Sequence, residues 1–277
     1  MQKVTHSEYI AQKKPLAKQL LAKLNEKYQY ASVLITDNYE KGYRASRSGV
    51  AISATNAFGG KGMIVKVYDG KGYAEYSTNE ITAENLPEIE REIEQQLMNP
   101  ANFIPEGTEE AEYKCISDEP CTLCEATDYE IHPREVGDEK LIETVTALRE
   151  KAVKADERIL DAITGFNYQE YHKLFLSANR ELEQSVLYST GIMALVAAKG
   201  EEIKQSFRGF SNLGGAELLD KMESAIPQCV KTVTDLLNAE PMEPGTYECI
   251  CTPEVTGMIV HEAFGHGVEM DMFVKDR

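Results

Sequence analysis

In the first part of the chain, the hydrophobic positions switch between helical and strand spacing. Apolar residues three and four apart predict two helices, one over 15–28 and one that Thr82 caps and that stops before Pro100. Runs rich in β-forming residues predict strands over 31–36, 43–54, 63–68 and 73–77. The last two flank Asp69-Gly70-Lys71-Gly72, which is typical of a hairpin turn. This order predicts a small α+β domain over residues 1–105.

The next stretch, 106–245, combines two long helical patterns with a run of strands. Helices are predicted over 138–154 and 216–238, the second kinked at Pro227 because proline removes a helical hydrogen bond. Antiparallel strands are predicted over 159–210, with turns near Gly165, Asn179, Gly191 and Gly200. These patterns predict a helix-flanked antiparallel sheet as a middle domain, and the α+β class for the chain as a whole.

The last stretch, 246–277, is predicted to begin a third domain. Alternating residues predict a strand over 247–251. Thr252-Pro253 is a good helix start, because a hydroxyl can cap the helix and proline suits its first position. The apolar residues that follow have helical spacing, so the helix is predicted to run into His261.

The composition narrows the class of protein. The chain has 277 residues, 42% hydrophobic and 27% charged, which fits a soluble globular protein. Its formal charge of -17 argues against a direct nucleic-acid surface, because phosphate binding needs clustered Lys and Arg. Met1–His6 lacks the apolar core of a signal peptide, and the longest apolar run, near 192–198, is far shorter than the ~20 residues that span a bilayer. We therefore expect a cytoplasmic protein with reduced cysteines.

The most specific chemistry lies near the end of the chain, where Glu262 follows His261 and His266 comes five positions after the first histidine. Neutral imidazoles are good zinc ligands, and a neighbouring carboxylate can act as a general base. In the familiar His-Glu-x-x-His arrangement, the histidines differ by about 40° around the helix and face one metal ion. At a spacing of five the difference is about 140° on an ideal α-helix, which points the second histidine away.

The spacing therefore suits a metal only if the helix is locally wound wider. A π-type turn near Gly265 would achieve this, and such turns often occur at functional sites. Gly265 and Gly267 permit unusual backbone angles, so we expect these glycines to correct the spacing. The alternative is that His261 and His266 are ordinary helix-end residues.

This stretch carries a family resemblance. The residues concerned are His261-Glu262-Ala263-Phe264-Gly265-His266, Glu269 and Asp271. They resemble the motif of the catalytic, TldD-type subunits of the TldD/PmbA metallopeptidase family, whose members are also called modulator of DNA gyrase proteins. The resemblance implies that His261 and His266 bind Zn²⁺ and that Glu262 is the general base. It also implies extended or unfolded peptides as substrates, and a homodimer or a heterodimer with a related subunit.

The resemblance leaves the third zinc ligand open. In the family this ligand is a cysteine from a domain downstream of the motif, and a catalytic zinc site has three protein ligands and an open position. Because the sequence ends at Arg277, we expect it to be the N-terminal portion of such a protein, or to use a substitute ligand. Glu269 or Asp271 could hydrogen-bond a ligand histidine, act as the third ligand, or be a solvated surface charge.

The cysteines offer a competing chemistry. The pattern Cys-x5-Cys-x2-Cys-x7-His is formed by Cys115, Cys121, Cys124 and His132. A Cys-x-x-Cys pair can be half of a zinc knuckle or a redox pair, but the outer spacings fit no standard knuckle, which favours free thiols in a loop. Cys249 and Cys251 share one face of the predicted strand, and we expect them to be buried structural residues.

Two other functions therefore compete with a zinc-dependent metallopeptidase. One is a non-catalytic dimerisation or substrate-presenting module. The other is a zinc or redox protein that works through Cys121 and Cys124. The peptidase requires that metal is lost on replacement of either histidine of the motif, whereas the cysteine hypothesis requires that metal survives both changes and is lost on Cys121→Ser.

Overall fold

The computed structural model describes residues 1–54, 60–98, 114–270 and 272. Contacts divide the chain into two compact units, Met1–Asn238 and Ala239–Arg277, which we describe one at a time. The helices are α1 (Glu8–Lys27), α2 (Leu86–Met98), α3 (Pro133–Val136), α4 (Asp138–Lys154), α5 (Leu218–Leu236) and α6 (Pro253–Val260). The strands are β1 (Gln2–Lys3), β2 (Tyr30–Ser46), β3 (Gly49–Ala54), β4 (Lys61–Tyr68), β5 (Tyr73–Thr78), β6 (Cys121–Ala126), β7 (Asp128–Tyr129), β8 (Ile159–Ser177), β9 (Arg180–Lys199) and β10 (Glu202–Leu213).

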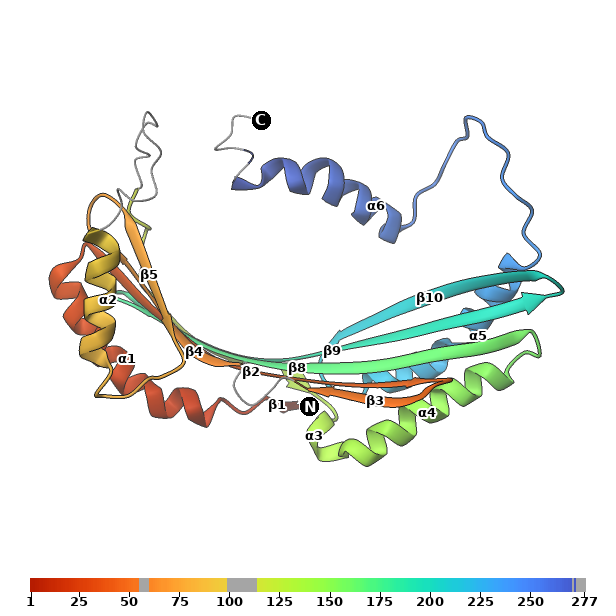
Figure 1. The fold of residues 1–277 in the computed structure, drawn as a ribbon, viewed down its shortest axis with the longest axis horizontal. Helices are drawn as coiled ribbons and strands as arrows, with labels where there is room; N and C mark the ends of the chain where they lie inside the picture. The colour runs from red at the N-terminus through yellow and green to blue at the C-terminus, as the bar shows by residue number, and fades with distance from the viewer. Residues whose placement is uncertain (55–59, 99–113, 271, 273–277) are drawn as a thin grey trace. The chain divides into compact units, whose positions relative to one another are not determined.

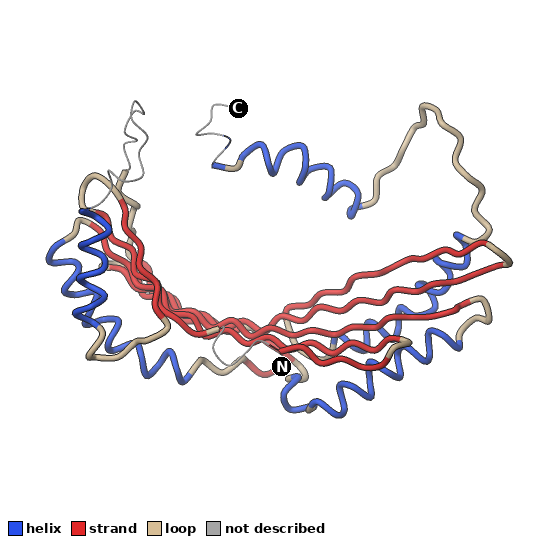
Figure 2. Tube along the Cα trace, viewed as in Figure 1, coloured by secondary structure: helices blue, strands red, loops and turns tan. Residues whose placement is uncertain are grey.

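The first unit is built on one long sheet with the strand order β10-β9-β8-β2-β4-β5. Its neighbours along this path are antiparallel, while β3 pairs with the far end of β2 and β6 pairs in parallel with β9. Three strands are long: β2 has 17 residues, β8 has 19 and β9 has 20. They run along most of the sheet (Figure 2) and so connect its two ends.

Two hydrophobic cores lie on the same face of this sheet. Val33 and Ile35 of β2 belong to one core, and Tyr43 and Ala45 to the other. All four have odd numbers, and side chains alternate between faces along a strand, so both cores share a face. Helices α1 and α2 cover the first core, and α4 and α5 cover the second (Figure 1). The pairing of β2 with β8 thus joins, in one sheet, two stretches that the sequence analysis assigned to different domains.

The structure confirms the α+β class and most of the predicted elements. Helix α4 coincides with the prediction, and β4 and β5 form the expected hairpin. The turn at Gly200 is also confirmed, but those at Gly165 and Gly191 are wrong, because both glycines lie inside strands. A Cβ at Gly191 would lie 2.4 Å from the Sδ atom of Met222 in α5. Glycine at this position therefore reflects the close approach of a helix and not a chain reversal.

The second unit is small and carries its side chains at its surface. The strand predicted over 247–251 is wrong, since these residues have no regular secondary structure. A strand needs a neighbour to satisfy its backbone groups, and the sequence pattern alone cannot supply one. No residue of α6 is buried, and Met258 is 60% exposed. In the part of the chain that is described, no helix is both long enough and apolar enough to cross a bilayer.

Candidate metal centre

Helix α6 begins where the sequence predicts, with Thr252 as N-cap and Pro253 as its first residue. The Thr252 side chain makes no capping hydrogen bond. Its carbonyl oxygen accepts a hydrogen bond from the N–H of Thr256 at 2.9 Å, which is the first backbone bond of the helix. Glu254 lies in the first turn, where a negative charge interacts favourably with the helix dipole. The local sequence thus starts a helix eight residues before the first histidine of the motif.

The helix widens at the motif itself. His261–Gly265 forms a π turn, and His266–Val268 follows as a 3₁₀ turn. The N–H of His266 donates to the carbonyl oxygen of His261, which is the i to i+5 bond of a π-helix. His266 therefore lies one full turn after His261, as a shared metal requires. The predicted π turn is confirmed.

The glycines of the motif do not act as the sequence analysis expected. Gly265 has φ of -56° and ψ of -51°, which are ordinary helical values. Gly267 is likewise absent from the glycines with positive φ. The wider hydrogen-bonded turn corrects the spacing by itself, and no unusual backbone angle is needed at either position.

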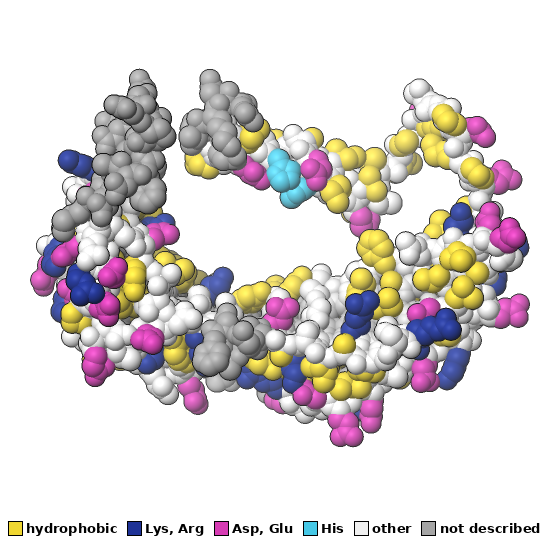
Figure 3. All heavy atoms as spheres, viewed as in Figure 1, with side chains coloured by type: hydrophobic (Ala, Val, Ile, Leu, Met, Phe, Trp, Pro, Cys, Tyr) yellow, Lys and Arg dark blue, Asp and Glu magenta, His cyan; other side chains and the backbone are white. Residues whose placement is uncertain are grey.

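The π turn brings three donor side chains together. His261, Glu262 and His266 each offer one ligand atom, and these atoms all lie within 4.8 Å of one another. The two imidazole rings are 4.7 Å apart at an angle of 73°. The Nε2 atom of His266 is 3.7 Å from the Oε2 atom of Glu262. Figure 3 shows histidine on the surface of this unit, beside acidic and hydrophobic side chains.

Glu269 fixes the orientation of His266. Its Oε1 atom lies 2.6 Å from the Nδ1 atom of His266. An ionised carboxylate only accepts hydrogen bonds, so Nδ1 is the donor in this pair, and in the neutral imidazole Nε2 then keeps its lone pair. Ligand histidines are commonly held by a carboxylate in this way. Of the roles considered for Glu269, the hydrogen bond to His266 is the one that the structure contains. Asp271 lies outside the described residues.

The donor set fits a divalent transition metal. Two neutral imidazoles beside a carboxylate are typical ligands for zinc, and the geometry holds both rings on one side of the chain. All three residues are exposed, so a water molecule or a substrate can reach the site. The sequence-predicted site residues are therefore brought together.

The cysteine pattern forms no comparable group. Cys115, Cys121 and Cys124 are free and exposed. Within residues 1–54, 60–98 and 114–270, the side chains close enough together to share one metal ion are those of the motif, His261, Glu262 and His266. Cys124 instead lies 3.4 Å from the Nε2 atom of His6, whereas His132 caps α3 through its Nδ1 atom. The structure thus supports free thiols and not a zinc knuckle at this position.

The two cysteines before α6 are also free. The expectation that Cys249 and Cys251 are buried is wrong, because both are exposed. The physical reason is the missing strand: without a sheet over 247–251 there is no inner face for them to occupy. Cys249 makes only a weak contact of 3.7 Å with the carbonyl oxygen of Tyr247.

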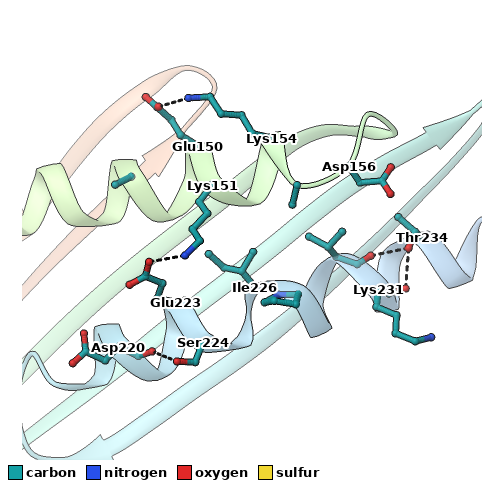
Figure 4. A pocket seen from close by; sticks show the side chains of 14 residues that line it. Glu150, Lys151, Lys154, Asp156, Asp220, Glu223, Ser224, Ile226, Lys231 and Thr234 are labelled. Atoms are coloured by element: carbon teal, nitrogen blue, oxygen red, sulfur yellow. Dashed lines mark hydrogen bonds and ion pairs between the residues drawn. The ribbon is translucent and has the colours of Figure 1, made fainter.

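A large surface cavity of about 1250 Å³ lies elsewhere, between α4 and α5 (Figure 4). Four of its charged side chains form two ion pairs with one another. Lys151 is 2.7 Å from Glu223, and Lys154 is 2.9 Å from Glu150. The side chains of these pairs are at least half exposed, and such surface pairs contribute little to stability and need no ligand. No histidine is among the described residues that line this cavity, so it lacks the His-Glu-His donor set of the motif.

The fold is shared with three solved structures, two of them named modulators of DNA gyrase and one named TldE. A presumed modulator of DNA gyrase from Bacteroides thetaiotaomicron has a TM-score of 0.67 at 16% identity, over 91% of this chain and 56% of that one. A second, from Thermotoga maritima, has a TM-score of 0.64 at 14% identity, over 84% of this chain and 50% of that one. TldE from Thermococcus kodakarensis has a TM-score of 0.56 at 13% identity, over 79% of this chain and 47% of that one. The resemblance seen in the motif is therefore confirmed at the level of the fold.

In sequence, the chain matches archaeal proteins named metalloproteases. The Archaeoglobus fulgidus protein is 32% identical over 95 residues, which is 34% of this chain and 22% of that protein. The Methanocaldococcus jannaschii protein is 20% identical over 259 residues, covering 92% of this chain and 55% of that protein. The chain thus spans between about a fifth and about half of the curated relatives it matches. No model of a known protein family matches it.

Proposed function

We propose that this chain belongs to a zinc-dependent metallopeptidase that hydrolyses peptide bonds in extended or unfolded peptides. One observation carries the proposal: the π turn that places donor atoms of His261, Glu262 and His266 within 4.8 Å of one another. A helix-borne His-Glu-His group is the arrangement used by many zinc peptidases. The metalloprotease names of the curated relatives support the same class.

Each side chain has a distinct role in this proposal. His261 and His266 hold the metal, and Glu269 keeps the Nε2 atom of His266 available by binding its Nδ1–H. A zinc ion, when bound, polarises the scissile carbonyl and lowers the pKa of a water molecule. Glu262 accepts the proton of the attacking water and delivers it to the leaving amine. We assign Glu269 as a positioning residue, because its Oε1 atom is hydrogen-bonded to the Nδ1 atom of His266.

The proposal extends to location and partners. A cytoplasmic protein that acts as a homodimer, or as a heterodimer with a related subunit, remains the expectation from the family resemblance. The charge of -17 argues against nucleic acids as partners. The mass of the purified protein in solution, alone and with a related subunit, tests the dimer directly.

The catalytic part is tested with Glu262→Gln, which keeps the size of the side chain but removes the base. Hydrolysis of a fluorescently labelled unfolded casein would be followed after chelation and after zinc is restored. We expect the variant to keep its metal and to lose activity by about 10²- to 10⁴-fold, the usual contribution of a general base. Glu248→Gln, an exposed carboxylate before the helix, is the matched control and should be unaffected.

Two outcomes would contradict the proposal. Full activity in Glu262→Gln would exclude this residue as the base. A protein that holds zinc through the two histidines but cleaves no peptide would instead favour the non-catalytic module.

A further inference from the structure

A free thiol and an imidazole meet in the first unit, outside the metal motif. The Sγ atom of Cys124 lies 3.4 Å from the Nε2 atom of His6. Cys124 is exposed on β6, and the side chain of His6 is 35% exposed. A thiol within hydrogen-bond reach of an imidazole is the arrangement of a cysteine nucleophile and its base.

The local fold holds His6 in this place from both sides. On one side, the N–H of Val4 donates to the carbonyl oxygen of Thr127 at 3.0 Å, which ties this segment to the end of β6. On the other side, the hydroxyl of Ser7 caps α1. Cys124 is placed by the parallel pairing of β6 with β9. The backbone therefore brings together two side chains that are 118 positions apart in the sequence.

The far side of the His6 ring contacts a buried chain of polar groups. Its Nδ1 atom is 2.9 Å from the Oγ atom of Ser185, which is also 2.9 Å from the Nδ1 atom of His172. The Nε2 atom of His172 in turn faces the carboxylate of Glu170, at 3.6 Å from Oε2. Ser185, His172 and Glu170 are only 1%, 8% and 5% exposed. Cys124 is thus the exposed end of a chain that leads into the protein.

The carboxylate of Glu170 determines the direction of this chain. It favours the N–H, and not the lone pair, of the ring nitrogen that faces it, so the Nδ1 atom of neutral His172 is an acceptor. The Ser185 hydroxyl then donates to His172 and accepts from the Nδ1–H of His6. This leaves the Nε2 atom of neutral His6 with its lone pair toward the thiol of Cys124, as a base requires.

A second carboxylate stabilises the ring of His6 once the ring takes a proton. The Oε1 atom of Glu183 is 3.8 Å from the Nδ1 atom of His6, and its Oε2 atom is held by Lys14 at 2.8 Å. The side chain of Glu183 is only 15% exposed, so water screens its charge little. The carboxylate therefore favours an imidazolium at His6, and the imidazolium favours a thiolate at Cys124.

Two neighbouring cysteines lack this arrangement. The Sγ atom of Cys115 contacts the carbonyl oxygen of Ile116 at 3.7 Å, and Cys121 lies at the start of the same strand as Cys124. In the described part of the chain, neither thiol has a hydrogen bond to a histidine. All three thiols are exposed, so Cys115 and Cys121 serve as internal controls for access.

We propose that Cys124 is a modification site, a nucleophilic thiol with His6 as its base, which forms mixed disulfides with small disulfides such as oxidised glutathione. His6 takes the thiol proton, the sulfur of Cys124 attacks one sulfur of the disulfide, and the original S–S bond breaks as the new one forms. The departing thiolate receives the proton from His6. Cys124 is oxidised and the departing thiol is reduced, so no further oxidant takes part. The inference does not rest on the proposed peptidase, since no residue of the metal motif is involved.

The test is the rate of mixed-disulfide formation at each cysteine. The reduced 277-residue protein is incubated with oxidised glutathione at pH 7 in the presence of a chelator, quenched with acid, and analysed by peptide mass spectrometry. An ordinary thiol is about 3% ionised at pH 7, so full proton transfer gains at most about thirtyfold in rate. A less basic thiolate is a weaker nucleophile, by up to about tenfold. We therefore expect Cys124 to react at least about threefold faster than Cys121 and Cys115.

His6→Ala should remove this advantage, so that Cys124 reacts as slowly as Cys121, whose own rate should stay unchanged. The pH dependence separates a base from a structural residue. Between pH 6 and pH 7 the rate of an ordinary thiol rises about tenfold with its thiolate fraction. Wild-type Cys124 should rise less, and His6→Ala should restore the full rise.

Equal rates at Cys124 and Cys121 in the wild-type protein would overturn the proposal. This comparison needs no variant, so it decides even if His6→Ala does not fold. A folded His6→Ala protein in which Cys124 keeps both its rate and its pH dependence would also overturn it.

Discussion

Replacement of Gly191 by alanine tests how closely α5 packs on the sheet. A Cβ at this position would lie 2.4 Å from the Sδ atom of Met222 and 3.1 Å from its Cε atom, and Met222 is fully buried. Overpacking a core costs about 1–3 kcal/mol. Alanine recovers about 0.5–1 kcal/mol, because glycine is the more flexible residue in the unfolded chain. The difference is a loss of about 0–2.5 kcal/mol of unfolding free energy, and we expect about 1 kcal/mol for Gly191→Ala, the middle of that range.

Urea denaturation followed by circular dichroism measures this loss. Gly209→Ala is the matched control: the residue lies in β10, and a Cβ there would meet no atom within 4 Å. This control should be neutral or slightly more stable. In a Met222→Ala background, the clash disappears, so Gly191→Ala should be neutral or stabilising there. A Gly191→Ala protein as stable as the wild type would refute the packing argument, and so would an equal loss in both backgrounds.

Three further predictions concern single side chains. The hydroxyl of Thr164 donates to the carbonyl oxygen of Val145 at 2.6 Å in the core, so Thr164→Val should cost about 1–3 kcal/mol in urea denaturation, and an unchanged midpoint would contradict this. Glu269→Gln should weaken zinc binding by about 10- to 100-fold in competition with a chromogenic chelator, and undiminished affinity would remove its positioning role. The pKa of Glu170 is below 4.5 in the folded protein despite burial, because hydrogen bonding and neighbouring cations outweigh it. Its contribution to stability is therefore present above that pH and is lost as the pH falls through the folded-state value. Glu170→Gln should then flatten the acid side of the curve of stability against pH, and an identical acid slope would show that this group is not responsible.

The part of the fold that local pattern determines could be predicted from the sequence. Helix α4 and the hairpin of β4 and β5 follow from spacing and turn residues, and both were predicted correctly. The glycines within β8 and β9 were interpreted as turns, because a sequence shows a missing side chain but not the helix that packs against it. Residues 247–251 alternate like a strand, yet pairing with another strand decides whether one forms.

The metal motif and the cavities of the fold differ in the same respect. The metal motif lies within six residues, so its spacing required a wider turn if both histidines share a metal, and a π turn is present, although the role given to Gly265 was wrong. The cavity that Asp37 and His172 line, by contrast, collects residues from segments up to about 170 positions apart in the sequence. No spacing signal could identify it, because only the pairing of β2 with β8 brings Asp37 opposite His172.

The most direct test of the central claim is the zinc content per chain, measured by elemental analysis of the wild type and of His261→Ala, His266→Ala and His6→Ala. The last variant removes a histidine outside the motif and serves as the control. We predict stoichiometric zinc in the wild type and in His6→Ala, and its loss in both motif variants. Wild-type protein without zinc, or zinc that survives both His261→Ala and His266→Ala, would contradict the proposed metal centre.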